Sequence, residues 1–150
     1  NDNFNIKRLT YPLELNLSEI RQLDNPGNEM IAYGKIPMMV SAQCLKKTTK
    51  GCDHKKEILV LKDRKNSEMQ VKTHCDFCYN TILNSKPLSV LGMEKEVKKI
   101  SPSILRLWFT TENVGETKNV LRKYMDDFCN NVSVLNIDDF TRGHLKRGIE

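Results

Sequence analysis

The sequence predicts an α/β fold in which short strands alternate with helices, with a cysteine-rich β-hairpin inserted between them. Runs of large apolar residues, of which residues 104–110 are the clearest, alternate with segments whose apolar residues recur at helical spacing. Asn16 with Glu19, and Asn113 with Glu116, form capping boxes at the start of two helices. Such alternation is typical of parallel βα units.

The first third of the chain is predicted to hold two strands and a short helix. Residues 11–15 alternate partly between apolar and polar side chains, which indicates a strand. The helix that begins after Asn16 ends at the turn of residues 25–27. Residues 29–33 form the next strand, and extended chain follows a kink, because Pro37 argues against an undisturbed central strand.

The middle of the chain is predicted to be a lysine-rich loop followed by a hairpin. Residues 43–56 are polar and contain Gly51, which favours a loop. Residues 57–62 form the first arm of the hairpin, residues 63–67 have turn composition, and residues 68–72 return as the second arm.

The last third is predicted to contain two more strands and two more helices. Residues 87–91 form a short strand, and residues 104–110 form a longer one. Met93, Val97 and Ile100 keep helical spacing between these strands. The helix after the second strand places its apolar residues on one side: Val120, Leu121, Tyr124, Met125 and Phe128.

Composition bounds the class of protein. The 150 residues are 39% hydrophobic and 29% charged, which is ordinary for one globular domain and too apolar for a disordered chain. The longest apolar runs, residues 30–33 and 36–40, fall far short of the ~20 residues of a membrane helix, so we expect no membrane partner. Residues 1–4 lack the features of a signal peptide and an initiator Met, so we expect a cytoplasmic chain cut from a longer parent.

Four of the five cysteines form two pairs in loop-like sequence, Cys44 with Cys52 and Cys75 with Cys78. The predicted hairpin separates the pairs and would bring them together. Four thiolates around one centre are typical of zinc or iron–sulfur sites, and the spacing leaves both open. We therefore predict a metal site formed by these cysteines.

Other interpretations of the cysteines remain. Two disulfides would suit a secreted protein, and the Cys75–Cys78 spacing also occurs in redox pairs, although in a thioredoxin-like context. His74 could replace a cysteine as a zinc ligand. Cys129 extends the apolar side of the last helix and is expected to be a buried free thiol.

The formal net charge of +5 is confined to one segment. Between Cys44 and Lys72 the chain carries nine basic and four acidic residues, while the rest carries equal numbers of each sign. A phosphate-bearing partner such as RNA would meet such a segment, although lysine-rich loops are usually solvated without a ligand. The candidate substrate-binding residues are Lys46, Lys47, Arg64 and Lys65.

The sequence around the cysteines resembles a known family. The segments that carry the resemblance are YGKIPMMVSAQC (residues 33–44), KKTTKGC (46–52), LKDRK (61–65), CDFCYN (75–80), FTTEN (109–113) and GHLKRG (143–148). They resemble the C-terminal part of the long Firmicutes-type members of the collagenase-like peptidase family of unassigned catalytic type, peptidase family U-thirty-two.

This resemblance implies a partial TIM-like barrel of βα units, in which residues 1–150 form a single C-terminal fragment and residues 43–80 a cysteine-rich basic insertion. It implies a four-iron four-sulfur cluster on Cys44, Cys52, Cys75 and Cys78, with zinc as the alternative. The partners would be the remainder of the parent chain and an RNA or polypeptide substrate.

Two enzyme activities compete within that family. Some members are described as peptidases or collagenases, and others take part in oxygen-independent hydroxylation of RNA bases or of quinone precursors. The sequence holds no Ser/His/Asp constellation, Walker loop or H-E-x-x-H motif, so it identifies no catalytic residue for either activity. A third interpretation, from a different class, is a non-catalytic binding module that zinc stabilises.

Overall fold

The computed structural model describes residues 6–132, 134 and 138–147. Residues 1–4 and Gly148, which the sequence analysis used, lie outside the described residues. The chain divides into two compact units: unit 1 is Asn1–Gly34 together with Leu88–Glu150, and unit 2 is Lys35–Pro87. The cysteine-rich segment 43–80 therefore falls within unit 2.

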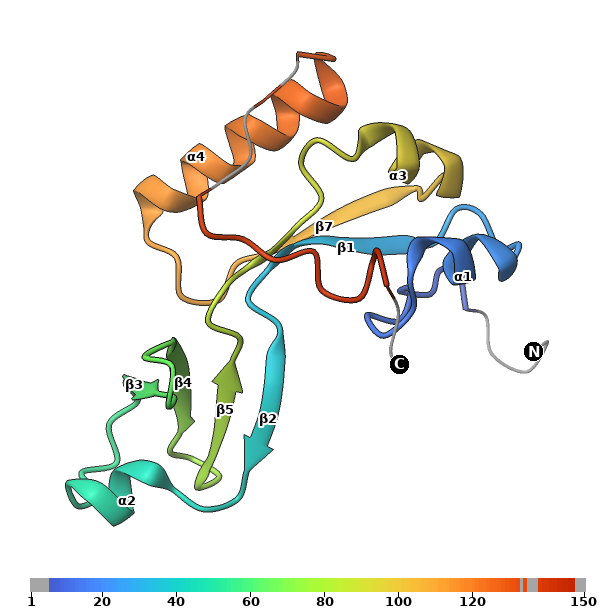
Figure 1. The fold of residues 1–150 in the computed structure, drawn as a ribbon. Coiled ribbons are helices and arrows are strands. Elements are labelled where there is room, and N and C mark those ends of the chain that lie inside the picture. The colour runs from blue at the N-terminus through green and yellow to red at the C-terminus, as the bar shows by residue number, and fades with distance from the viewer. Residues whose placement is uncertain (1–5, 133, 135–137, 148–150) are drawn as a thin grey trace. The chain divides into compact units, whose positions relative to one another are not determined.

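Unit 1 is built on a three-stranded sheet in the order β6-β1-β7, of which Figure 1 shows β1 and β7 side by side. β1 (Glu29–Gly34) lies between β7 (Ile104–Trp108), which runs parallel to it, and β6 (Leu88–Ser89), which runs antiparallel. All six residues of β1 are buried, as expected for a central strand. The helical elements are α1 (Leu17–Gln22), α3 (Glu94–Ile100), α4 (Val114–Tyr124) and the π-helix η1 (Met125–Cys129), which continues α4.

Unit 2 is a four-stranded antiparallel sheet in the order β2-β5-β4-β3, with one helix where β2 ends (Figure 1). Its elements are β2 (Pro37–Ser41), α2 (Leu45–Thr49), β3 (Ile58–Lys62), β4 (Glu68–His74) and β5 (Tyr79–Leu83). The predicted hairpin is confirmed, because Ile58 pairs with Lys72 and Lys62 pairs with Glu68.

The predicted partial TIM-like barrel of βα units is wrong. Antiparallel pairing dominates the described residues, which contain neither a closed barrel nor repeated βα units. Two antiparallel neighbours need only a turn between them, whereas a parallel pair needs a long crossover. The short connections of residues 63–67 and 75–78 therefore fold unit 2 as hairpins. β1 does pair in parallel with β7, but the whole of unit 2 lies between them in the sequence.

Helix α2 occupies residues that were predicted as loop. Its lysines are good helix formers despite their polarity, and the Thr48 and Thr49 hydroxyls donate to the carbonyl oxygens of Cys44 and Leu45, respectively, at 2.9 and 2.7 Å. The expectation of a loop was wrong for these five residues. Polarity alone therefore did not exclude a short helix here.

Residues 11–15 were wrongly predicted as a strand. Thr10 makes an isolated bridge with Glu29, and the chain then turns, since Pro12 has no amide hydrogen with which to continue a ladder. Tyr11 is buried and its hydroxyl donates to the carbonyl oxygen of Asn25 at 2.7 Å. The buried side chain of Tyr11 thus stabilises a turn rather than a strand.

Both predicted capping boxes are confirmed. The Asn16 side chain accepts from the Glu19 amide at 3.0 Å, and the Glu19 carboxylate accepts in return from the Asn16 amide at 2.7 Å. Asn113 and Glu116 make the same reciprocal pair at the start of α4. The helix starts were therefore fixed by local sequence.

The predicted strand at residues 104–110 is present but ends at Trp108. The Glu112 carboxylate accepts from the amides of Thr110 and Thr111 at 2.7 and 3.0 Å and turns the chain there. The predicted strand at 29–33 and the helix through Val97 and Ile100 are confirmed with small shifts at their ends.

Tyr124 joins three parts of the core of unit 1. Its hydroxyl donates to the carbonyl oxygen of Ala32 in β1 at 2.6 Å and accepts from the amide of Val90 at 3.1 Å. Burial raises the pKa of Tyr124 to about 12.

In the described part of the chain, no helix is long and apolar enough to cross a membrane.

Candidate functional site

The cysteine pairs lie at one end of the sheet of unit 2. β2 ends at Ser41, which pairs with Asn80 at the start of β5, and β4 ends at His74, which pairs with Tyr79. Cys44 comes three residues after the end of β2, while Cys75 and Cys78 form the turn between β4 and β5. The strand order therefore brings Cys44 and the Cys75–Cys78 turn to the same end of the sheet.

The turn that carries Cys75 and Cys78 is tight. The Phe77 amide donates to the carbonyl oxygen of His74 at 3.1 Å, and Cys78 has a positive φ of 54°. The rings of His74 and Tyr79 stack with their centroids 4.2 Å apart, and His74 Nε2 lies 3.1 Å from Thr81 Oγ1. These contacts fix the orientation of the His74 ring within the sheet and engage its Nε2 atom, so His74 could bind a metal in this arrangement only through Nδ1.

Cys44 and Cys52 flank α2, with Cys44 at its N-cap position and Cys52 exposed after its end. Between them, Lys46 is only 4% exposed. Its ammonium donates to the carbonyl oxygen of Lys55 at 2.9 Å and forms an ion pair with Asp53. The hydrogen bond between the two side chains raises the pKa of Lys46 and lowers that of Asp53.

A second carboxylate faces the same ammonium. Glu57 Oε1 lies 3.3 Å from Lys46 Nζ, which is an ion-pair distance, although the geometry there makes no hydrogen bond. The backbone of Glu57 is held from the other side by Thr73, whose hydroxyl accepts from the Glu57 amide at 2.8 Å and donates to its carbonyl oxygen at 2.9 Å. The start of β3 is therefore fixed to both α2 and β4.

Two hydrogen bonds connect the cysteine-bearing segments. Cys75 Sγ donates to the carbonyl oxygen of Lys55 at 3.2 Å, three residues beyond Cys52. The buried Asn80 donates through Nδ2 to the carbonyl oxygen of Gln43 at 2.7 Å, directly before Cys44. Asn80 Oδ1 has no hydrogen-bond partner among the residues that the structure describes. These two hydrogen bonds thus connect the segment that contains Cys44 and Cys52 to the turn between β4 and β5 and to the start of β5.

All five cysteines are free thiols, so the disulfide interpretation is not what the structure contains. Among the residues that the structure describes, no three His, Cys, Asp or Glu side chains are grouped closely enough to hold a metal ion. The four cysteines fit a soft metal by their chemistry, and Cys44, Cys75 and Cys78 lie at one end of the sheet of unit 2. Their thiols would have to turn toward one another to bind it.

The four candidate substrate-binding residues fall into two kinds. Lys47, Arg64 and Lys65 are exposed. Lys46 is buried and its charge is matched by Asp53 and Glu57, so it is not available to a substrate. Sequence reasoning could not separate Lys46 from Lys47, because the difference arises from the side of α2 on which each lies.

Cys129 is a free thiol, as predicted, but the prediction that it is buried was wrong. This cysteine is exposed at the end of η1, next to a small apolar hollow of about 130 Å³ lined by Leu105, Leu107, Tyr124, Met125, Phe128 and Cys129. Leu121 and Met125, which were predicted on the buried side of the helix, are 46% and 51% exposed, whereas Val120 and Tyr124 are buried. The rest of unit 1 therefore covers only part of the apolar side of this helix, and Leu121 and Met125 remain largely exposed.

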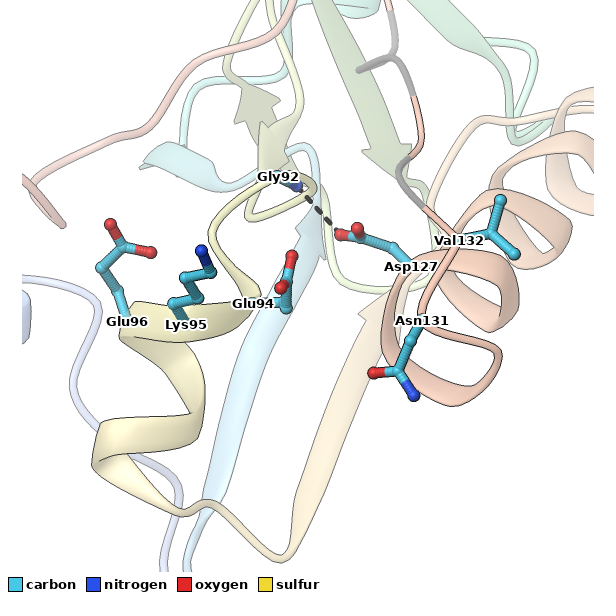
Figure 2. A pocket seen from close by; sticks show the side chains of 7 residues that line it. All are labelled: Gly92, Glu94, Lys95, Glu96, Asp127, Asn131 and Val132. Carbon is cyan, nitrogen blue, oxygen red and sulfur yellow. Dashed lines mark hydrogen bonds between the residues drawn. The ribbon is translucent and has the colours of Figure 1, made fainter.

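Unit 1 contains a larger hollow that sequence reasoning did not predict. Its volume is about 430 Å³, and its lining is Gly92, Glu94, Lys95, Glu96, Asp127, Asn131 and Val132. Asp127 is buried and accepts from the Gly92 amide at 2.9 Å, as Figure 2 shows. This bond ties η1 to the turn before α3, so the visible role of Asp127 is structural.

Comparisons of this chain with protein-family models, with curated proteins and with solved structures find no match.

Proposed function

We propose that unit 2 is a cysteine-based metal-binding module in which Cys44, Cys52, Cys75 and Cys78 supply the ligands. The observation that carries the proposal is the hydrogen bond from Cys75 Sγ to the carbonyl oxygen of Lys55, which joins the Cys75 turn to the segment that follows Cys52. Cys44 is held to the same end of the sheet through Gln43 and Asn80. Four soft donors, three of which lie at one end of a small sheet, match zinc or an iron–sulfur cluster.

A four-iron four-sulfur cluster is our preferred occupant, as the family resemblance implies, and zinc is the alternative. When bound, a cluster of this kind supplies electron transfer or Lewis-acid chemistry, whereas zinc would stabilise the loop. The chain's own residues would hold the thiols and balance the charge of four thiolates, with Lys55 and Lys56 exposed nearby.

The experiment is anaerobic purification followed by iron, sulfide and zinc analysis of wild type, Cys44→Ser, Cys75→Ser and Cys129→Ser. Cys129 is the matched control because it is an exposed thiol of unit 1. We expect about four irons and four sulfides in wild type and Cys129→Ser, and loss in the other two. If wild type contains one zinc per chain and no iron or sulfide, the occupant of the site is zinc and not the cluster. Equal metal in wild type and Cys75→Ser would contradict the proposal.

An RNA substrate is favoured by one further observation, the exposed basic side chains Lys47, Arg64 and Lys65 in the segment that carries the net charge. We propose that the parent enzyme is an oxygen-independent RNA hydroxylase and that this segment meets the phosphates. RNA affinity should then fall steeply with added salt and weaken in Arg64→Ala. A flat salt response would remove this function.

Peptidase activity, the other activity that the family resemblance implies, is tested separately. Proteolysis that disappears in Cys75→Ser would link the cysteines to it, and unchanged proteolysis would detach them. We also propose a cytoplasmic location for the metal-binding module, because thiols stay reduced there and can bind a metal.

A further inference from the structure

The cysteine-bearing segments share one acceptor with a buried cation. Lys46 Nζ and Cys75 Sγ both donate to the carbonyl oxygen of Lys55, at 2.9 and 3.2 Å. Lys46 lies two residues after Cys44, and Lys55 lies three residues after Cys52. A single backbone oxygen therefore lies between all the segments that carry the proposed ligands.

We propose that Lys46 is a positioning residue that locks the Cys44–Cys52 segment onto the Cys75 turn. This inference rests on the proposed metal-binding function, and it replaces the expectation that Lys46 contacts a substrate. Its ammonium reaches from α2 to Asp53 on the loop, to Glu57 at the start of β3, and to the Lys55 backbone between them.

Burial makes this arrangement specific to Lys46. Its side chain is 5% exposed, while that of Asp53 is 51% exposed and that of Glu57 is 37% exposed. A buried ammonium must be hydrogen-bonded and paired, so the loop that supplies its acceptors cannot leave without exposing or orphaning the charge. Lys47, the next residue of the same helix, is exposed and has no such constraint.

The side chains that hold a metal's ligands in place affect affinity even though they never touch the metal. Loss of such a residue typically lowers metal affinity about 10-fold to 100-fold. Lys46 meets this description, because it precedes Cys52 in the chain, its partners Asp53, Lys55 and Glu57 follow Cys52, and the Lys55 carbonyl oxygen also accepts from Cys75 Sγ.

The test compares Lys46→Met, Lys46→Arg and the matched control Lys47→Met in the full chain. After reconstitution with iron and sulfide, or with zinc, we expect Lys46→Met to lose metal to a chelator about tenfold faster than wild type. Lys47→Met should behave as wild type. Lys46→Arg should recover most of the retention, because a guanidinium donates to the same oxygens.

A readout that does not depend on metal keeps the two proposals separable. In metal-free protein, amide hydrogen exchange of residues 52–57 should be several-fold faster in Lys46→Met and unchanged in Lys47→Met. If Lys46→Met fails to fold, Asp53→Asn weakens the same pair from its exposed end and should show a smaller change in the same direction.

The outcomes are distinct. If wild type binds no metal, the proposed function fails, and exchange of residues 52–57 alone decides whether Lys46 locks the loop. If wild type binds metal but Lys46→Met matches Lys47→Met in both metal loss and exchange, the role of Lys46 is overturned while the metal site stands.

Discussion

The Tyr124 hydroxyl donates a 2.6 Å hydrogen bond to the carbonyl oxygen of Ala32, 92 positions earlier in the chain. The hydroxyl oxygen of Tyr124 accepts from the amide of Val90 at 3.1 Å and lies 3.3 Å from Ser89 Oγ. One buried phenol thus joins α4, β1 and the segment after β6. The Val90 amide also donates directly to the Ala32 carbonyl oxygen at 3.1 Å, so the phenol reinforces a backbone hydrogen bond between the same two groups.

Replacing Tyr124 by Phe should destabilise unit 1 by about 1–2 kcal/mol, since the Val90 amide and the Ala32 carbonyl would keep their bond to each other but lose their hydrogen bonds to the phenol. Trp108, the one tryptophan of the chain, lies in β7 and reports the unfolding of unit 1 by fluorescence in urea. Val114→Ala, at a side chain that is 71% exposed, is the control and should change the midpoint little. Equal midpoints for wild type and Tyr124→Phe would contradict the assigned role.

The same phenol predicts a loss of stability in alkali. Burial raises the pKa of Tyr124 from 10.0 to about 12, so the folded protein keeps a proton that the unfolded chain releases. The contribution is complete below about pH 10 and disappears as the pH rises through about 12. Burial also raises the pKa of Tyr33, which acts in the same direction. Urea midpoints between pH 9 and 11 should fall less steeply in Tyr124→Phe than in wild type; parallel curves would argue against it.

Gly34 should tolerate no side chain. It has φ of +144°, and a Cβ built there would lie 2.4 Å from the carbonyl oxygen of Trp108. We expect Gly34→Ala to destabilise unit 1 by more than about 2 kcal/mol. Gly27→Ala separates the two causes, because Gly27 has φ of +84° but no atom within 4 Å of its Cβ position. It should cost only about 1 kcal/mol. Equal losses in both variants would show that the close approach to Trp108 carries no weight.

Arg142 should not be replaceable by lysine. Its guanidinium donates through Nη1 to the carbonyl oxygen of Ser89 at 2.6 Å and through Nη2 to that of Leu91 at 2.9 Å, and it lies 4.6 Å from the centre of the Phe140 ring. Lysine keeps the charge but not the two-pronged geometry. Arg142→Lys should lower the stability of unit 1 by about 1–2 kcal/mol in the Trp108 assay. A loss seen only in Arg142→Ala would mean that charge alone matters.

Local signals were readable from the sequence and long-range ones were not. The capping pairs at Asn16 and Asn113 involve residues three apart, so their chemistry is complete in the sequence. The hairpin of β3 and β4 was readable because its turn is short. Strand partners chosen over long distances were not, which is why the alternating pattern wrongly predicted βα units.

The candidate site divides in the same way. The type and spacing of Cys44, Cys52, Cys75 and Cys78 can be read from the sequence, and the structure adds that Cys44 and the Cys75–Cys78 turn lie at one end of the sheet of unit 2. The burial of Lys46 could not be predicted, because it depends on Asp53 and Glu57 reaching back across the loop. In the sequence this lysine is one of nine basic residues between Cys44 and Lys72.

Thr73 provides the last prediction, at the base of the candidate site. It is 3% exposed, and its hydroxyl makes two hydrogen bonds with the backbone of Glu57, where β3 begins. Valine has the same shape but cannot bond, so Thr73→Val leaves the Glu57 amide without its side-chain partner and should destabilise unit 2 by about 1–3 kcal/mol.

Because Glu57 forms an ion pair with Lys46, the loss of the Thr73 hydroxyl should also loosen the loop that carries Cys52. Amide exchange of residues 55–60 should quicken in Thr73→Val, and metal retention should fall if the module binds metal. Thr49→Val is the control, since Thr49 is exposed and water can replace its hydroxyl contact. Exchange that stays unchanged in Thr73→Val would mean that the β3–β4 ladder alone fixes the position of Glu57, and that the ion pair with Lys46 does not depend on this threonine.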